Sequence, residues 1–276
     1  MTQVTTARVR SIASKLPERI REHNLTLVAA GVAFYAFLAI VPALIAIVSI
    51  YGLVASPTDV KRLVDDVGSS LPVEVRNFLV FQLTSIVNAN GAGVTTAAVI
   101  AIALALWSAS GGMAALVTGI HVAMERDEPK GFVVKRGKAL MLTIAAIVFL
   151  GVVAFLVVAV RPLLEHAAVG TPGRVALNVL GWLVLAAAVL VGVGLLYRFA
   201  LKDSPGGWLG FLTLGTVSAT VFWLVASGLF AAYTANFASY GKTYGALASI
   251  VVLLLWLWLS SLVVLIGAEV DGAGDG

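Results

Sequence analysis

The sequence predicts an all-α, polytopic membrane protein built as a bundle of six transmembrane helices. Of its 276 residues, 60% are hydrophobic and only 12% are charged, about half the charged share of a typical soluble domain. Most of the surface of such a chain cannot face water, so its surroundings are lipid. In lipid the backbone must satisfy its own hydrogen bonds, and continuous rather than alternating apolar runs favour helices over a barrel.

Six apolar runs are long enough to cross the hydrocarbon core, which takes about 20 residues in a helix. They cover Leu25–Val54, Val94–Ile120, Ala139–Val160, Val175–Leu196, Trp208–Ala232 and Tyr244–Val270. No connecting stretch is long enough for a separate domain. We therefore expect a basic, cytoplasmic N-terminal segment over residues 1–24, a membrane domain over residues 25–270 and a cytoplasmic tail over residues 271–276.

Lysine and arginine residues set the expected orientation, because cytoplasmic loops of membrane proteins carry an excess of both. With the N-terminus in the cytoplasm, twelve of them fall on the inner side and six on the outer side. An even number of spans then returns the C-terminus to the cytoplasm. We therefore expect a multi-pass protein with both termini inside the cell.

The segment between the first two spans, residues 56–90, differs from an ordinary loop. After Pro72, apolar residues recur at helical spacing: Val75, Phe78, Leu79, Leu83, Ile86 and Val87. This spacing places them on one face of a helix. We expect one or two amphipathic helices on the outer face, which pack on the end of the bundle, lie in the membrane interface or cap a cavity.

Residues with catalytic or ligand-binding chemistry do not form a recognisable pattern. The chain has no cysteine, and His23, His121 and His166 are scattered along it. The acidic cluster within residues 125–128 is interleaved with basic residues on a short connection, which is typical of a solvated loop. We expect no catalytic, cofactor or metal site. We also expect no nucleic-acid partner, because the positive charge follows membrane topology instead of forming one patch.

Charged residues are almost absent from the interior of the spans. Ion-coupled transporters usually need them there, at a cost of about 3 kcal/mol or more each, so ion-driven transport is not favoured. Uncharged polar and aromatic residues are better candidates to line a transport path: Tyr35, Trp107, Ser108, Ser110, Asn178, Tyr233, Asn236, Tyr240, Tyr244, Ser260 and Ser261. Pro42 is a further candidate, because it removes a backbone donor inside the first span and kinks it.

Glu269 is the acidic residue nearest to the interior of any span, at the end of the last one. A carboxylate at a helix C-terminus is disfavoured by the helix dipole, by roughly 0.3–1 kcal/mol. We therefore expect Glu269 to have a cationic partner. The nearest expected cytoplasmic cations are Arg19, Arg21, Arg136, Lys138 and Arg198. Such a pair is either a structural clamp between helices or a cytoplasmic gate or headgroup site.

Three stretches of the sequence resemble one known family. Residues 30–42 read AGVAFYAFLAIVP, residues 240–245 read YGKTYG, and residues 267–269 read GAE. In this order and spacing they resemble the YihY/BrkB family of bacterial inner-membrane proteins. Two positions depart from the family pattern: Ala39 stands where the family often has serine, and Asp271 where it usually has asparagine.

The resemblance implies a six-span protein of the bacterial plasma membrane, from a family without an agreed biochemical activity. The family also carries an old ribonuclease label. Hydrolysis of RNA needs clustered carboxylates or histidines in a water-filled site, usually with metals. Because the sequence shows no such cluster, we do not expect nuclease activity.

Two hypotheses about function follow. In the leading one, a multi-pass plasma-membrane protein moves or binds a lipidic or amphipathic molecule, with membrane lipids as partners. The alternative is a structural or assembly protein of the cell envelope that does not transport. A deep polar-lined cavity would favour the first, and a bundle filled with Leu, Val and Ala the second. The candidate functional or organising residues are Tyr35, Pro42, Tyr240, Tyr244 and Glu269; neither a substrate nor an oligomeric state follows from the pattern.

The expected topology can be tested by cysteine labelling, since the chain has no native cysteine. Single cysteines on the expected cytoplasmic side should not react with an impermeant thiol reagent until the cells are lysed. The positions to be replaced are Ser14, Ser204 and Gly274. Single cysteines on the expected outer side should react in intact cells. They would replace Ser69, Ala168 and Ser239. Labelling of the first set before lysis would reverse the orientation.

Overall fold

The structure is a computed structural model, and it describes residues 2–54, 96–128, 130–167, 170–201, 210, 212–237 and 246–275. These residues form seven helices and no strand, which confirms the all-α class. The helices are α1 (Thr2–Glu22), α2 (Leu25–Val54), α5 (Thr96–Ala123), α6 (Phe132–Ala167), α7 (Gly170–Ala200), α8 (Leu214–Phe237) and α10 (Ala246–Asp275). The expected amphipathic segment over residues 56–90 lies outside the described residues.

The lengths and composition of the helices fit a polytopic membrane protein. Within the described residues, five helices are long and apolar enough to cross a membrane, namely α5, α6, α7, α8 and α10. A sixth candidate is a bent pair, Ser14–Glu22 with Leu25–Ala39, whose two parts meet at 59°. Each of the six apolar runs read from the sequence corresponds to one of the helices from α2 to α10.

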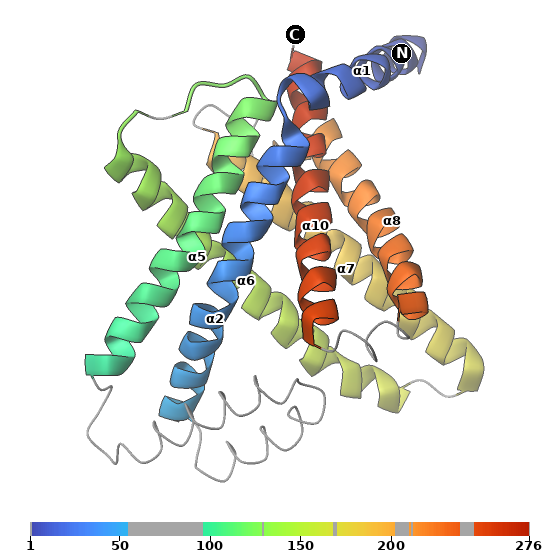
Figure 1. Ribbon diagram of the computed structural model, residues 1–276. Coiled ribbons are helices and arrows are strands. Elements are labelled where there is room, and N and C mark those ends of the chain that lie inside the picture. Colours follow the sequence, from blue (N-terminus) through green and yellow to red (C-terminus); the bar gives the residue numbers. More distant parts are fainter. Residues whose placement is uncertain are drawn as a thin grey trace.

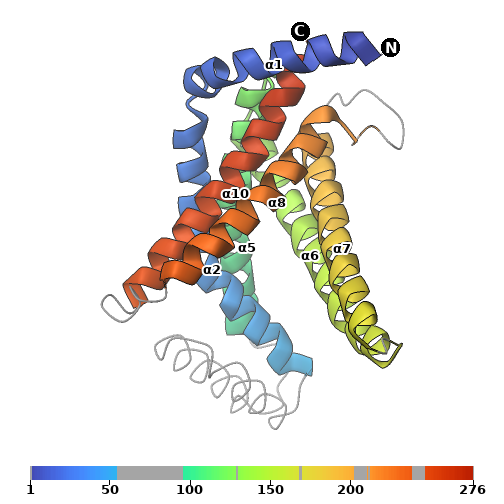
Figure 2. The ribbon, with the colours of Figure 1, turned by 90° about the vertical axis from the view of Figure 1, so that its right-hand side faces the viewer.

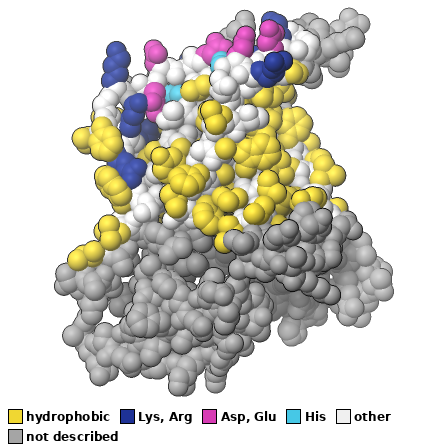
Figure 3. Space-filling view, in the orientation of Figure 1, with side chains coloured by type: hydrophobic (Ala, Val, Ile, Leu, Met, Phe, Trp, Pro, Cys, Tyr) yellow, Lys and Arg dark blue, Asp and Glu magenta, His cyan; other side chains and the backbone are white. Residues whose placement is uncertain are grey.

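One end of the bundle carries both chain termini (Figure 1). α1 lies across this end, where the last turns of α10 also arrive (Figure 2). We call it the terminal end. The corner between α1 and α2 is made by His23 and Asn24, and Asn24 has a φ of 50°, a left-handed conformation that asparagine tolerates better than most residues. Figure 3 shows charged side chains gathered at this end, above a surface of hydrophobic ones.

The helices pack in a defined order. α2 lies beside α5 and α10, and α8 packs on α10, while α6 and α7 form a hairpin that contacts α5 and α8 (Figures 1 and 2). The buried apolar core lies toward the terminal end, where Leu25, Ile120 and Leu265 are fully shielded from solvent. Among the described residues, packing of buried apolar side chains is therefore found mainly at this end of the bundle.

Small residues let α8 and α10 approach closely at the terminal end. A β-carbon on Gly267 would lie 2.5 Å from the β-carbon of Ala219 and 2.7 Å from both the Gly215 carbonyl oxygen and the Tyr197 hydroxyl. The Tyr197 hydroxyl also donates to the carbonyl of Val264. Because these distances are shorter than van der Waals contact, only glycine fits at position 267 with the present packing.

Gly267→Ala should therefore lower stability by about 1–3 kcal/mol, because the added methyl group would push α8 and Tyr197 away from α10. The measurement is the melting temperature of the detergent-solubilised protein. Gly228→Ala in α8 is the matched control, because no atom lies within 4 Å of its added β-carbon and alanine favours the helix by up to about 1 kcal/mol. Equal melting temperatures for the two variants would contradict the close α8–α10 contact.

Candidate functional site

Glu269 lies in α10 with its side chain fully shielded from solvent. The helix continues beyond it to Asp275, through most of the expected tail. The expectation that Glu269 sits at a helix end, opposed by the dipole, is therefore wrong. The larger cost is desolvation, which amounts to several kcal/mol for an ion inside a protein. Such a carboxylate requires both a countercharge and hydrogen bonds.

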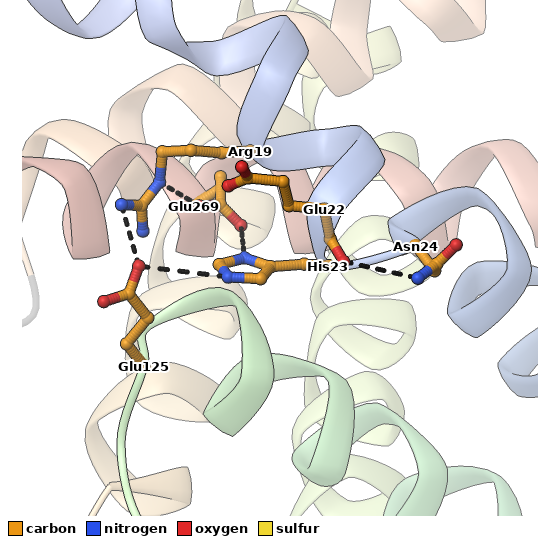
Figure 4. A network of polar contacts seen from close by, with 6 residues as sticks. All are labelled: Arg19, Glu22, His23, Asn24, Glu125 and Glu269. Carbon is orange, nitrogen blue, oxygen red and sulfur yellow. Dashed lines mark hydrogen bonds and ion pairs between the residues drawn. The ribbon is translucent and has the colours of Figure 1, made fainter.

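Two side chains from the α1–α2 corner supply them (Figure 4). Arg19 donates from Nε to Oε1 of Glu269, and His23 places Nδ1 2.9 Å from Oε2. Arg19 also pairs with Glu125, just past the end of α5, with Nη1 2.9 Å from Oε1. His23 Nε2 lies 3.9 Å from the same oxygen. We call Arg19, His23, Glu125 and Glu269 the terminal network.

The terminal network confirms that Glu269 has a cationic partner, and the structure selects Arg19 from the five candidates. Arg136 and Lys138 donate instead to the backbone carbonyls of Trp107 and Ala200, each at 2.5 Å. Arg19 is largely buried, whereas Glu125 is mostly exposed. The network therefore runs from a shielded carboxylate to a water-facing one and ties α1, α5 and α10 together.

Asp271, one turn of α10 closer to the C-terminus than Gly267, makes a second polar link at the terminal end. Thr213 precedes α8, and its Oγ1 accepts a hydrogen bond from the Thr216 amide at 3.0 Å, as an N-cap does. Asp271 completes this cap from another helix: it accepts from the Thr213 hydroxyl at 2.5 Å and from the Gly215 amide at 2.6 Å. A carboxylate is favoured at a helix N-terminus. An asparagine at position 271, as in the family that the sequence resembles, would have only one side-chain oxygen to accept these two hydrogen bonds.

The acidic cluster after α5 is divided between two partners. Glu125 joins the terminal network, whereas Glu128 accepts from Thr118 at 2.7 Å and from Lys135 at the start of α6. Burial raises the pKa of the Glu128 carboxyl, but the hydrogen bonds from Lys135 and Thr118 outweigh it and the pKa is lowered. Its contribution to stability is thus present above the pKa of the unfolded chain and is lost as pH falls through the lowered value.

Of the other predicted site residues, only the side chain of Tyr35 is described, and it does not join the terminal network. Tyr35 is half-exposed on α2, with its ring edge-on to Phe34 at 5.7 Å between centroids. α2 continues through Pro42 without a break, but the side chain of Pro42 lies outside the description. Tyr240 and Tyr244 fall outside the described residues altogether.

Sequence reasoning missed His23, Glu125 and the partners of Asp271. A signal was present for the first two: His23 directly precedes the first span and Glu125 directly follows the second. Both positions belong to the same expected side of the membrane, at the same level as Glu269. His121 is a buried histidine whose Nδ1 lies 2.9 Å from the Val117 carbonyl oxygen. Within the described part of the chain, no group of three or more His, Asp or Glu is arranged to hold a metal ion.

The fold and the site define a class: a polytopic α-helical membrane protein whose helices are tied at one end by buried charges. The family described as "Virulence factor BrkB" matches residues 16–274. The chain therefore belongs to the BrkB family, which confirms the resemblance seen in its sequence.

Several relatives are similar to this chain, and two of those named below are membrane proteins by name. YfkH of Bacillus subtilis (strain 168), which is named as ribonuclease-like, is 28% identical over 275 residues, covering 95% of this chain and 94% of YfkH. A UPF0761 membrane protein of Aeromonas salmonicida (strain A449) is 58% identical over 53 residues, 19% of this chain and 18% of that protein. One of Vibrio vulnificus (strain YJ016) is 36% identical over 98 residues, 35% of this chain and 30% of that protein. No solved structure matches the chain.

Glu269→Gln should destabilise the detergent-solubilised protein by about 3 kcal/mol, because it leaves the largely buried Arg19 without the carboxylate that faces it. The melting temperature is the measurement. Glu22→Gln is the matched control, since Glu22 is an exposed residue near Arg19 on α1. If both variants have the melting temperature of the native protein, Glu269 does not stabilise the terminal end.

Proposed function

We propose that the protein moves or binds lipidic or amphipathic molecules in the bacterial plasma membrane. The observation that supports this is the uneven burial of the α6–α7 hairpin. Over Val179–Ala200 in α7 four of the 22 residues are buried, against seven of the 18 residues over Leu106–Ala123 in α5. α7 is therefore attached to the rest of the protein over a small part of its length.

The exposed part of α7 has no covered face. Residues 179–185 are all exposed, and seven consecutive residues make about two helical turns, so they point in every direction around the axis. Nearer the terminal end, Val193, Tyr197 and Ala200 are buried. α6 follows the same pattern, with Leu142 buried and Leu150 well exposed. Among the described side chains, the hairpin is packed at the terminal end and mostly exposed over residues 144–152 of α6 and 179–185 of α7.

Bare apolar helices have a direct consequence in a bilayer. Their surface must be covered by acyl chains, on the side that faces the other helices as well as on the outer side. Lipid chains then have access between the hairpin and the rest of the bundle. The terminal network closes the opposite end with charge. In our proposal this end faces the cytoplasm and acts as a gate or an anchor for the moving helices.

The proposal assigns no catalytic activity to the chain. Two acidic groups after α5 at the terminal end already have partners: Glu125 pairs with Arg19, and Glu128 with Lys135 and Thr118. Carboxylates held in this way are poorly suited to act as a general base. The ribonuclease-like name belongs to YfkH.

The alternative function, a scaffold of the cell envelope, is favoured by a different observation. The core at the terminal end is filled with apolar side chains such as Leu25, Ile120, Val193 and Leu265, as expected of a bundle that does not open. In a scaffold, the bare hairpin would be covered by another protein in place of lipid. The two functions therefore differ in what covers α7.

Lipid movement can be measured with the purified protein in liposomes that contain fluorescent phosphatidylglycerol. We expect the outer-leaflet quencher dithionite to bleach nearly all of the fluorescence at a rate that depends on protein, compared with about half in protein-free liposomes. Heat-denatured protein reconstituted in the same way is the control. Bleaching that stops at the protein-free level would exclude lipid movement and favour the scaffold.

Contact between acyl chains and the exposed part of α7 can be measured separately. Single cysteines at Leu180, Gly181, Leu183 and Val184 would carry a fluorophore around the helix, and brominated acyl chains should quench all four. A position buried at the terminal end, Val193, should be quenched least. If positions on one side of residues 180–184 were protected from quenching in native membranes but not in liposomes, a protein partner would cover that side of the hairpin.

A further inference from the structure

Arg136 is a cation without a countercharge among the residues that the structure describes. It lies in the second turn of α6, and its guanidinium carbon sits 4.1 Å from the centre of the Trp107 ring. Its Nη2 donates to the Trp107 carbonyl oxygen at 2.5 Å. Its Nε is buried and has no hydrogen-bond partner. Among the described residues, no carboxylate lies within ion-pair distance of Arg136.

Its neighbours on α6 make the contrast clear. Lys135 pairs with the Glu128 carboxylate, and Lys138 donates to the Ala200 carbonyl at the end of α7, where the helix dipole favours a cation. Arg136 has only a neutral carbonyl and an aromatic face. Of the five N–H donors of a guanidinium, most therefore have no acceptor within the described part of the chain.

Arg136 also contacts α5 far from its ends. Trp107 stands near the middle of α5, which covers Thr96–Ala123, and lies about 24 Å along the helix from Ala123 at 1.5 Å per residue. Trp107 and Arg136 both belong to candidate membrane spans. Basic side chains reach below the charged rim, among hydrophobic ones, at the edge where α6 begins (Figure 3). A charge at this level is costly and marks a functional site when it is kept.

An aromatic side chain from a third helix completes the surroundings. A β-carbon on Gly111 would lie 3.6 Å from Cδ1 of Tyr35 and 3.9 Å from Nη1 of Arg136, so both side chains border the same small residue. Tyr35 and Trp107 are about half-exposed. The apolar side chains of Leu38 and Leu104 are exposed on the same helices. Cationic and aromatic groups therefore lie beside a surface suited to acyl chains.

We propose that Arg136, with Trp107 and Tyr35, binds the phosphate of an anionic membrane phospholipid. Guanidinium and phosphate match in charge and planar geometry, and Arg is the preferred side chain for this contact. The phosphate would supply the countercharge and acceptors that the protein does not. The apolar surroundings favour a lipid over free phosphate, because the acyl chains would lie on Leu38 and Leu104 while the headgroup meets Arg136. The proposal deepens the proposed function, since it names the class of lipid, but the binding itself does not require movement.

The test is native mass spectrometry of the purified protein in detergent. The probes are phosphatidylglycerol, diacylglycerol with the same acyl chains, and inorganic phosphate. We expect the native protein to retain phosphatidylglycerol at least tenfold better than diacylglycerol, and millimolar phosphate to leave this binding unchanged. Arg136→Gln should reduce binding at least tenfold, and Arg136→Lys, which keeps the charge but loses the planar fork, should fall between.

Lys130→Gln is the matched control: it removes one positive charge from an exposed residue close to the start of α6 and should bind as the native protein does. Equal binding by Arg136→Gln and the native protein would overturn the proposal. So would displacement by free phosphate, or equal retention of diacylglycerol and phosphatidylglycerol. Should Arg136→Gln fail to fold, two other measurements test the proposal. They are the comparison of the three ligands on the native protein and the reduced phosphatidylglycerol binding expected of Trp107→Phe.

The liposome assay separates this inference from the proposed function. Selective phosphatidylglycerol binding that depends on Arg136, without lipid movement, would support the site and overturn transport. Lipid movement together with equal phosphatidylglycerol binding by Arg136→Gln and the native protein would support transport and overturn the site.

Discussion

The buried carboxylate of Glu269 is the constraint on which the terminal end depends. A charge without access to water needs a countercharge, and here that comes from Arg19, far away in the sequence. Meeting this requirement places α1 across the end of α10 and brings the residue after α5, Glu125, to the same arginine. The ion pair therefore fixes the relative positions of helices whose apolar faces alone would not specify them.

The last turns of α10 concentrate the contacts that hold the other helices. Gly267 admits α8 and the Tyr197 hydroxyl of α7, Asp271 caps the start of α8, and Gly272 lies against the end of α5. A β-carbon on Gly272 would come within 2.7 Å of the Ala123 carbonyl oxygen. Close backbone approach and polar links thus occur together over two turns of one helix. Farther from these turns, the described side chains of the α6–α7 hairpin over residues 179–185 are all exposed.

Arg19 and Arg136 have different surroundings, and the difference bears on function. At the terminal end, Arg19 and Glu269 neutralise each other's charge, so the pair is suited to holding helices together. Near the middle of α5, Arg136 contacts a carbonyl and an aromatic ring but no carboxylate of the described segments. A matched charge contributes to the fold, whereas an unmatched one in apolar surroundings is best explained by a ligand that completes it.

The sequence by itself determined the class of protein, because apolar runs of span length leave the backbone no alternative to helices in lipid. It also predicted a cationic partner for Glu269, but from an expected helix end; the burial that makes a partner necessary is visible only in the structure. Only the tertiary structure decided that the cation is Arg19, that His23 and Glu125 join it, that Asp271 caps α8 and that Arg136 reaches Trp107. The spans are apolar on all sides, so their pattern carries no signal for which face meets which neighbour. Those choices depend on how the helices rotate and cross, which close contacts such as Gly215 with Gly267 settle in three dimensions.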